Sequence, residues 1–312
     1  MSLIDVFKAY RNIREYVAWT PLMYSYKLSR IANCNVYLKL ENIQVTGSFK
    51  VRGACNAVKS LSREELERGI ITASSGNHGI GLAYISSKLG VKSIIVMPKN
   101  TSKWKIELCK AFGGEVVLAG DNYDEAEEYC FKIARENDLT YISSYADLKV
   151  IAGQATIAHE IFMDNPDINT ILVPIGGGGL ISGVAFYAKT VNPKVKIIGV
   201  QTDKARTMYE SFKAKRVVEV PYEPCLAEAL AGKISELTLK FTLKYVDDII
   251  LVEDEKLMEA VLWTLKNEHQ VVEPSGVVGI AAILQRKMKF NRNENVAIIV
   301  SGGNMDIRKI VK

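Results

Sequence analysis

One lysine, Lys50, stands in a sequence setting that favours chemistry over a simple surface charge. It lies within the run TGSFKVRGA (residues 46–54), between a phenylalanine and a hydroxyl-rich turn that contains a glycine. A lysine amine can form a Schiff base with a carbonyl compound once burial or a neighbouring group lowers its pKa. Most lysines are solvated surface charges, so this interpretation depends on the other motifs of the chain.

A run of four glycines, Gly176–Gly179, follows an apolar strand-like segment and precedes a helix that we expect to begin near Ser182. Successive N–H groups in such a turn can converge on one anion, assisted by the helix dipole. Ile181 stands where a dinucleotide-binding pattern needs its third glycine, and no Gly-Lys-Ser/Thr closes a nucleoside-triphosphate loop. The turn therefore predicts a site for a single phosphate group. The alternative is a flexible turn that permits close packing.

Two further turns could contribute polar groups. The run ASSGNHG (residues 73–79) offers two hydroxyls, an amide and an imidazole at a helix start, a set able to hold a carboxylate and a phenolic oxygen. The same run is also an ordinary helix-capping turn, and a lone histidine such as His78 is more often structural than catalytic. Ser301 ends the last predicted strand. Combined with the lysine and the phosphate turn, it suggests a hydrogen-bond partner for a cofactor ring.

Composition excludes several classes of protein. The 312 residues are 48% hydrophobic and 24% charged, with a net charge of +5 and no basic block, so a nucleic-acid partner is not expected. The N-terminus lacks a signal peptide pattern, and the uncharged stretch 171–188 is broken by Pro174 and glycines, so we expect a cytoplasmic protein without a membrane span. The five cysteines are an odd, dispersed set without a Cys-x-x-Cys pair, so we expect reduced thiols, and the three histidines are too far apart for a zinc site.

Strand-like and helical segments alternate along most of the chain, which predicts an α/β fold with parallel sheets covered on both faces. Segments 72–96 and 173–200 each read as strand, glycine-rich turn, helix and strand, so two lobes are expected, although one doubly wound sheet would fit as well. The expected strands are 69–73, 91–97, 115–118, 170–174, 195–200, 249–252 and 296–300. The expected helices are 79–89, 103–112, 123–136 (capped by Asp121), 152–163, 254–268 and 276–288.

Four motifs together resemble those of the serine/threonine dehydratase and serine racemase family, pyridoxal-phosphate enzymes of fold type II. The motifs are TGSFKVRGA, SSGNHG, the glycine run and SGGN (residues 301–304), in the family's order. The resemblance implies a two-lobed fold with the cofactor between the lobes. We expect a large domain of residues 1–68 and 147–312, and a small inserted domain of residues 69–146.

The resemblance also implies roles for residues. Lys50 would carry pyridoxal 5'-phosphate and move the substrate α-proton, and Ser75 would be a second acid/base on the opposite face. Other cofactor contacts would come from Phe49, Asn77, Gly176, Gly177, Gly178, Gly179, Leu180 and Ser301. The substrate carboxylate would be received by Ser74, Ser75, Gly76, Asn77 and His78. A serine facing the pyridine nitrogen cannot hold that nitrogen protonated as an aspartate would, which favours elimination of the β-hydroxyl.

The sequence departs from the family pattern at several positions. Gln201 and Thr207 stand where metal-binding relatives carry acids, so no metal is expected. The usual His-Pro pair is replaced by Ser143-Ser144, and Ala126 stands where racemases of the mammalian type carry an arginine. The sequence stops at Lys312, and we expect no regulatory domain that responds to isoleucine.

The sequence therefore predicts an α,β-elimination of L-threonine and L-serine to 2-oxobutanoate or pyruvate and ammonia. Alternatives are a serine racemase, a dual racemase and dehydratase, or a threo-3-hydroxyaspartate dehydratase. A β-replacement synthase is disfavoured because those relatives place Lys-Asp-Arg where this chain has Lys50-Val51-Arg52. A non-catalytic binding protein on the same scaffold remains a further alternative. An amino acid is the expected partner, together with copies of the same chain in a homodimer or homotetramer.

Overall fold

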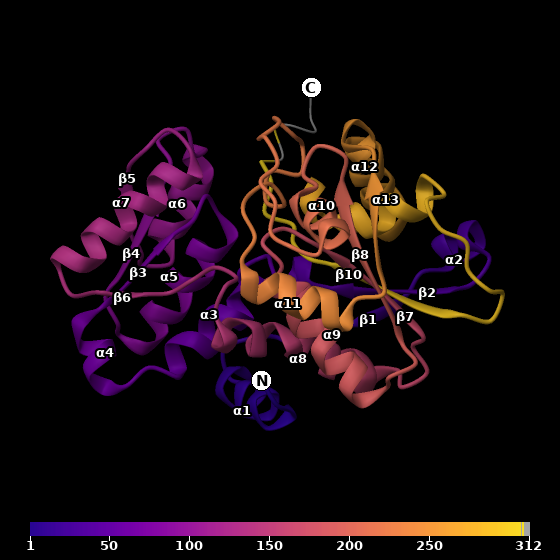
Figure 1. Cartoon of the computed structure of the whole chain (residues 1–312), viewed down its shortest axis with the longest axis horizontal. Helices are drawn as coiled ribbons and strands as arrows, with labels where there is room; N and C mark the ends of the chain where they lie inside the picture. The colour runs from indigo at the N-terminus through magenta and orange to yellow at the C-terminus, as the bar shows by residue number, and fades with distance from the viewer. Residues whose placement is uncertain (307, 309–312) are drawn as a thin grey trace.

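The strands form two separate sheets, each with its own helices. The structure, a computed structural model, describes residues 1–306 and 308, so the chain end at Lys312 lies outside the described residues. In Figure 1 the smaller sheet and its helices lie on the left and the larger sheet on the right, with α3 and α8 between them. The two-lobed expectation is confirmed, and the single doubly wound sheet is not what the chain forms.

The larger sheet has six strands in the order β1-β2-β10-β7-β8-β9. Only β1 runs antiparallel to its neighbour, and the other pairings are parallel. The strands are β1 Leu22–Tyr24, β2 Asn35–Leu40, β7 Thr170–Pro174, β8 Lys196–Thr202, β9 Asp248–Val252 and β10 Asn295–Val300. Because parallel strands end at the same edge, the segments after β7 and β10 meet there, and these segments carry the glycine turn and Ser301.

The smaller sheet has four parallel strands in the order β5-β4-β3-β6. These are β3 Ile70–Ala73, β4 Ser93–Met97, β5 Glu115–Leu118 and β6 Thr140–Tyr141. All four strands fall within the segment expected to form the small domain. The domain limits at residues 69 and 146 stay a prediction.

Helices cover both sheets. In the smaller lobe they are α4 Arg63–Arg68, α5 Asn77–Leu89, α6 Lys103–Ala111 and α7 Tyr123–Glu136. Elsewhere they are α1 Leu3–Ile13, α2 Tyr26–Ala32, α3 Lys50–Lys59, α8 Leu148–Asp164, α9 Gly179–Val191, α10 Thr207–Ala214, α11 Glu236–Tyr245, α12 Leu257–Glu268 and α13 Val278–Leu284, with short 3-10 turns η1 Glu41–Ile43, η2 Asp254–Lys256 and η3 Pro274–Gly276. No helix in the described part of the chain is long and apolar enough to span a membrane.

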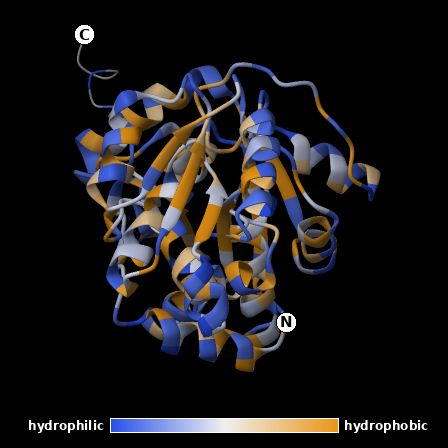
Figure 2. Ribbon diagram, turned by 90° about the vertical axis from the view of Figure 1, so that its left-hand side faces the viewer, coloured by the Kyte–Doolittle hydropathy of each residue, from blue (hydrophilic) through white to orange (hydrophobic). Residues whose placement is uncertain are grey.

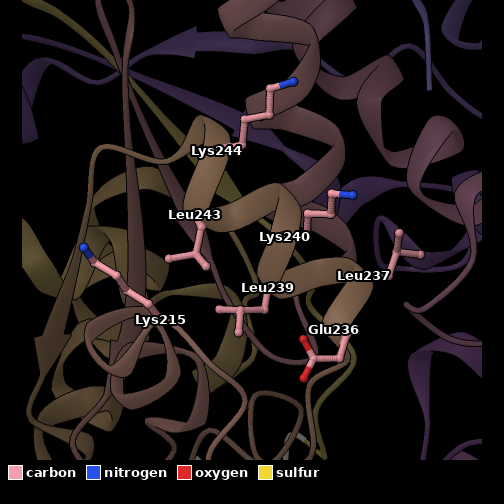
Figure 3. Close-up of a pocket in the computed structure, with 7 residues that line it drawn as sticks. All are labelled: Lys215, Glu236, Leu237, Leu239, Lys240, Leu243 and Lys244. Atoms are coloured by element: carbon pink, nitrogen blue, oxygen red, sulfur yellow. The ribbon is translucent and has the colours of Figure 1, made fainter.

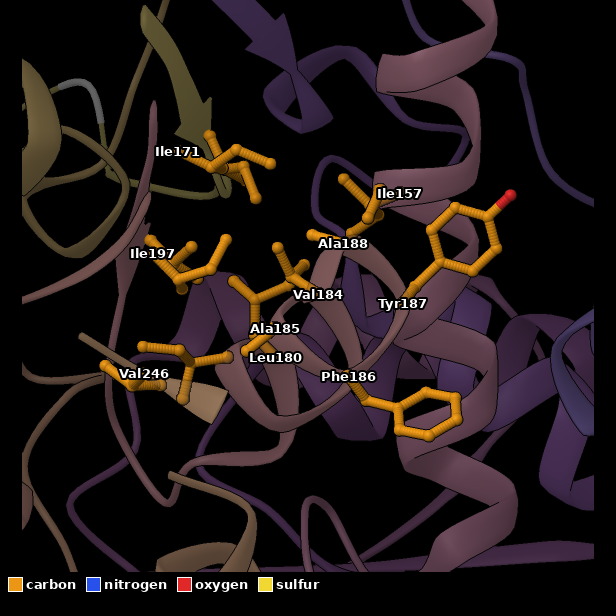
Figure 4. Packing of buried hydrophobic residues seen from close by; sticks show 14 of the residues in the cluster. Ile157, Ile171, Leu180, Val184, Ala185, Phe186, Tyr187, Ala188, Ile197 and Val246 are labelled. Atoms are coloured by element: carbon orange, nitrogen blue, oxygen red, sulfur yellow. The ribbon is translucent and has the colours of Figure 1, made fainter. Parts of the chain in front are cut away.

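Apolar side chains fill both faces of the larger sheet, as strand alternation requires. Ile171 packs into the cluster under α8 and α9, whereas its neighbour Leu172 packs into the cluster under α2, α12 and α13. Figure 4 shows Val184 of α9 packed near Ile171 and Ile197 of the sheet. In Figure 2 the strands are mostly hydrophobic, while the helices over them carry mixed residues. Burial on both faces fixes the strands of the larger sheet, and the glycine turn and the segment that carries Ser301 follow two of these strands.

One helix cap and several helix boundaries differ from the sequence expectation. Asn122, not Asp121, caps α7, because its side chain accepts a hydrogen bond from the Glu125 N–H over 3.0 Å. Helix α9 begins at Gly179 rather than near Ser182, since Gly178, with φ of +94°, is its N-cap. The helix expected over 276–288 is shorter, because η3 occupies its start and α13 ends at Leu284.

A fully buried group of four charges anchors α3, the helix that begins at Lys50. Arg52 of α3 pairs with Glu41 over 2.8 Å and with Glu160 of α8 over 2.6 Å. Lys39 of β2 contacts the second oxygen of Glu160 over 2.7 Å. Two cations and two carboxylates balance, and bidentate arginine pairing satisfies most of their hydrogen-bonding atoms. The network therefore ties β2, α3 and α8 together beside Lys50.

Candidate active site

Lys50 begins α3 directly after a tight turn that is held against the end of β10. Gly47 in that turn has φ of +72°, and Ser48 forms an isolated bridge with Gly302. The main-chain nitrogen of Phe49 donates to the Ser301 oxygen over 3.1 Å. The turn therefore brings two predicted cofactor residues, Phe49 and Ser301, next to the lysine.

The amine of Lys50 is held in a setting that favours its neutral form. Its side chain is partly buried, and Nζ donates to the main-chain oxygen of Ser144 over 2.9 Å. Removal from water lowers the pKa of Lys50 to about 8, against an opposing attraction from Glu273. The amine also lies 5.4 Å from the centre of the Phe49 ring. Near and above pH 8 much of the Lys50 amine is neutral, and a neutral amine can act as a nucleophile and a base.

The glycine turn joins β7 to α9 at the carboxyl edge of the larger sheet. The first N–H groups of a helix have no partner inside it, so the start of α9 presents donors to an anion. A Cβ on Gly177 would lie 2.6 Å from the Tyr145 ring, and one on Gly179 would lie 2.9 Å from the Tyr145 Cα. Leu180, the next residue, is buried beneath the turn. Only glycines permit this close approach.

Ser144 and Tyr145 connect the amine to the glycine turn. Ser144 accepts the Lys50 hydrogen bond, and the next residue packs against Gly177. The spacing of amine and anion site is thus set by two consecutive residues of the segment between β6 and α8. The sequence analysis noted only the neighbouring Ser143-Ser144 pair, as a departure from the family pattern.

The polar turn after β3 uses its residues in different ways. The Ser74 hydroxyl accepts from the N–H groups of Gly76 and Gly79 over 3.2 and 2.9 Å, so it caps the start of α5. Ser75 is exposed. His78 is buried, and burial together with the Lys50 charge lowers its pKa to about 3, which keeps the imidazole neutral. A carboxylate held at this turn would meet N–H and hydroxyl groups rather than an imidazolium.

Asn77, the first residue of α5, lies within hydrogen-bonding reach of the large lobe. Its Nδ2 donates to Glu273 over 2.6 Å, and its Oδ1 accepts from Asn304 over 2.8 Å. Asn304 also donates to the main-chain oxygen of Thr46 over 2.8 Å. Asn77 is therefore connected to Asn304, which follows Ser301, and through Asn304 to the turn at Thr46 that precedes Phe49.

Glu273 is the main site residue that sequence reasoning missed. It is buried, and burial raises its pKa to about 7, although Lys105 and Asn77 act in the opposite direction. The available signal was a single acid between apolar residues and a Pro-Ser-Gly turn, in the run VVEPSG (271–276). An acid in such a setting is a candidate for a buried carboxylate.

Gln201, one of the two positions at which no metal-binding acid was expected, uses its side chain to hold the main chain. Gln201 Nε2 donates to the main-chain oxygen of Ile175 over 3.1 Å, and its Oε1 accepts from the Tyr209 N–H over 2.8 Å. Thr207 is the first residue of α10. Within residues 1–306 and 308, no group of three His, Cys, Asp or Glu side chains is placed to hold a metal ion.

A surface hollow of about 550 Å³ lies elsewhere, beside α11 (Figure 3). It is lined by Lys215, Glu236, Leu237, Leu239, Lys240, Leu243 and Lys244. None of these residues belongs to the candidate active site. Figure 3 shows the amines of Lys240 and Lys244 pointing away from Lys215, so they do not converge on one ligand.

Two largely parallel sheets, with a partly buried lysine, an anion-binding glycine turn and polar turns between them, define a two-lobed cofactor enzyme. The chain belongs to the pyridoxal-phosphate dependent enzyme family, whose sequence model matches residues 13–302. Its cofactor is pyridoxal phosphate. Three features of the site fit that group: the lowered pKa of Lys50, the N–H groups at the start of α9, and glycines that leave no room for Cβ atoms.

Relatives within the family are similar over almost the whole chain. L-threonine ammonia-lyase of Thermotoga maritima is 41% identical over 311 residues, which cover 99% of this chain and 77% of that protein. The catabolic L-threonine dehydratase TdcB of Staphylococcus aureus is 40% identical, with 99% and 91% covered. The solved structure of maize serine racemase superposes with a TM-score of 0.96 at 32% identity, covering 99% of this chain and 95% of that one.

Proposed function

We propose that this protein removes ammonia from L-threonine and L-serine by α,β-elimination, releasing 2-oxobutanoate or pyruvate. The observation that carries the proposal is the Lys50 amine, which has a pKa of about 8 and is held by Ser144 beside the glycine turn. Support for these substrates comes from relatives named for threonine at 40–41% identity over 99% of the chain.

When bound, pyridoxal phosphate supplies an electron sink that stabilises negative charge at the substrate α-carbon. The N–H groups of Gly176, Gly177, Gly178 and Gly179 would hold its phosphate, and Phe49 would pack against its ring. Asn77 would donate to its phenolic oxygen, and Ser301 would face its ring nitrogen. Because a hydroxyl is a weaker proton donor than a carboxylic acid, Ser301 would leave that ring nitrogen neutral, which would favour loss of the β-hydroxyl over other chemistry at the α-carbon.

Lys50 has two tasks in this proposal. It would hold the cofactor, and its neutral amine would accept the substrate α-proton and return a proton to the departing hydroxyl. The N–H groups of Ser75 and Asn77 and the hydroxyls of Ser74 and Ser75 would receive the substrate carboxylate, in a turn shaped by Gly76 and next to neutral His78. The low pKa of His78 suits this arrangement, because a neutral imidazole does not compete with Lys50 for the released proton.

The test is release of 2-oxobutanoate from L-threonine by purified protein loaded with cofactor. Wild-type protein should release equal amounts of 2-oxobutanoate and ammonia, and Lys50→Ala should release neither. Lys59→Ala, at the last residue of α3, is the matched control and should retain wild-type turnover. A wild-type protein that binds cofactor but releases no oxo acid from threonine or serine would contradict the proposal.

Racemisation of serine is a second candidate, favoured by the exposed Ser75 and by the fold of maize serine racemase. Racemisation needs an acid/base on the face opposite Lys50, and the Ser75 hydroxyl is the proposed group. Ser75→Ala should abolish formation of D-serine while pyruvate release persists. Equal loss of both products would show that Ser75 serves substrate binding instead. For the wild-type protein, turnover of threo-3-hydroxyaspartate in place of threonine would assign that compound as the substrate.

A cytoplasmic location and a homodimer or homotetramer complete the proposal. Analytical ultracentrifugation of the loaded protein tests the oligomer, and a monomer at micromolar concentration would contradict it.

A further inference from the structure

Glu273 is a buried carboxylate at the site to which the proposed reaction assigns no task. It precedes η3, and its main-chain nitrogen donates to the Gly302 oxygen over 3.1 Å. A Cβ on Gly302 would lie 2.3 Å from Glu273 Oε1. The carboxylate thus fills the space that the missing side chain of Gly302 leaves, one residue after Ser301.

Hydrogen bonds fix the orientation of the Asn77 amide. An ionised carboxylate only accepts hydrogen bonds, so Glu273 must face the Asn77 nitrogen, at 2.6 Å. The Asn304 nitrogen only donates, so it must face the Asn77 oxygen, at 2.8 Å. One N–H of Asn77 is therefore committed to Glu273, and the direction of the second N–H follows from the planar amide.

We propose that Glu273 is a positioning residue, which accepts one N–H of Asn77 and thereby aims the other at the phenolic oxygen of the bound cofactor. The inference rests on the cofactor role proposed for Asn77. A hydrogen bond to an ionised acceptor is short and strong. A donor already held in its binding orientation loses less freedom when the cofactor binds, which raises affinity.

Charged groups from several elements face Glu273. Burial raises the pKa of Glu273 to about 7, and Glu228, in the segment between α10 and α11, acts in the same direction. Lys105 of α6 and Lys50 of α3 oppose this shift. Lys105 lies 3.7 Å from Glu228. Protonation of Glu273 below pH 7 removes the charge from the hydrogen bond to Asn77, so cofactor affinity should fall as the pH falls through this range.

A double-mutant cycle on the cofactor dissociation constant tests whether Glu273 acts through Asn77. Glu273→Ala and Asn77→Ala should each weaken binding about tenfold, the effect of losing one charge-assisted or cofactor-facing hydrogen bond. The double variant should bind no more weakly than Asn77→Ala alone. Effects that add independently would overturn the inference.

Glu273→Gln separates orientation from charge and also guards against misfolding of the alanine variant. Its amide oxygen can still accept from Asn77, so it should recover most of the affinity and the wild-type visible absorbance maximum, but lose the change in affinity near pH 7. Binding as weak as that of Glu273→Ala would contradict the inference. Glu268→Gln is the control, because this buried carboxylate of α12 accepts from the Ser25 hydroxyl over 2.7 Å and lies outside the site.

The outcome is separable from that of the proposed function. Normal threonine turnover with an additive cycle would overturn the role of Glu273 alone. A non-additive cycle in a protein that does not act on threonine or serine would overturn the elimination proposal alone.

Discussion

Lys50 Nζ donates a hydrogen bond to the main-chain oxygen of Ser144 over 2.9 Å. The contact joins the first residue of α3 to the segment that leads from β6 of the smaller sheet into α8. Tyr145, the next residue, packs on Gly177. A movement of this segment would therefore change the position of the amine and the shape of the anion-binding turn together, which couples the two halves of the site.

The ionisation of Lys50 should govern how fast cofactor binds. Burial lowers the pKa of its amine from 10.5 to about 8, and only the neutral amine is a nucleophile. The association rate constant for pyridoxal phosphate should therefore rise with pH through an apparent pKa near 8 and level off above it. Stopped-flow absorbance at several pH values measures this. A profile still rising steeply toward pH 10 would mean that the amine is not desolvated.

Gly178→Ala should weaken cofactor binding and destabilise the protein. The φ of Gly178 is +94°, and an added Cβ would lie 2.6 Å from Met208 Cε and 2.8 Å from Thr238 Cβ. We expect a loss of roughly 2–4 kcal/mol of stability from strain and overpacking together. Gly90→Ala is the control, because its φ is +66° but nothing lies within 4 Å of an added Cβ. Thermal unfolding should separate the two variants, and equal shifts would contradict a crowded turn.

Arg52→Ala should leave the buried carboxylate of Glu41 without its cation and leave Glu160 with Lys39 alone. We expect the free energy of unfolding to fall by about 3–5 kcal/mol, since removing one partner strands the others in a medium that solvates charge poorly. Arg52→Lys should recover only part of the loss, because an ammonium cannot pair with both carboxylates in a bidentate way. Urea titration measures this. The exposed pair Arg63–Glu67 is the control, where Arg63→Ala should change stability by no more than about 1 kcal/mol.

Glu273 should reduce stability as the pH rises. Its pKa is raised from 4.5 to about 7, so the folded protein binds this proton more tightly than the unfolded chain. The stability linked to this group is complete below pH 4.5 and is lost as the pH rises toward 7. Relative to wild type, Glu273→Gln should therefore gain up to about 3 kcal/mol between pH 4.5 and 8. Urea unfolding at both pH values tests this, and a constant difference would show that Glu273 is not buried as a charge.

Much of the α/β architecture could be predicted from the sequence, because most strands that pair in parallel are short apolar runs bounded by glycine or proline. The segments 115–118 and 170–174 were predicted with the bounds that the structure has. Strand β2 was missed because the charged Lys39 interrupts its run of apolar residues, although this lysine is fully buried in the structure. That lysine is buried only because Glu160, more than a hundred residues away, neutralises it, and no local pattern reveals such a partner.

The candidate site was predictable where its chemistry lies in short motifs. Lys50, Asn77, Ser301 and the glycine turn come from four such motifs, and hydrogen bonds or close packing connect each to the segments around Lys50. Tyr145 and Glu273 act through distant partners, Gly177 and Asn77, so their roles depend on the tertiary arrangement. The capping task of the Ser74 hydroxyl likewise became evident only from the geometry of the turn.

The most direct test of the account is to locate the cofactor on the chain. Protein loaded with pyridoxal phosphate would be reduced with borohydride, digested, and analysed by mass spectrometry. If Lys50 carries the cofactor, the added mass will be found on Lys50, and Lys50→Ala will lose both this mass and the release of 2-oxobutanoate from L-threonine. Attachment at another lysine, such as Lys105, with turnover retained in Lys50→Ala, would contradict it.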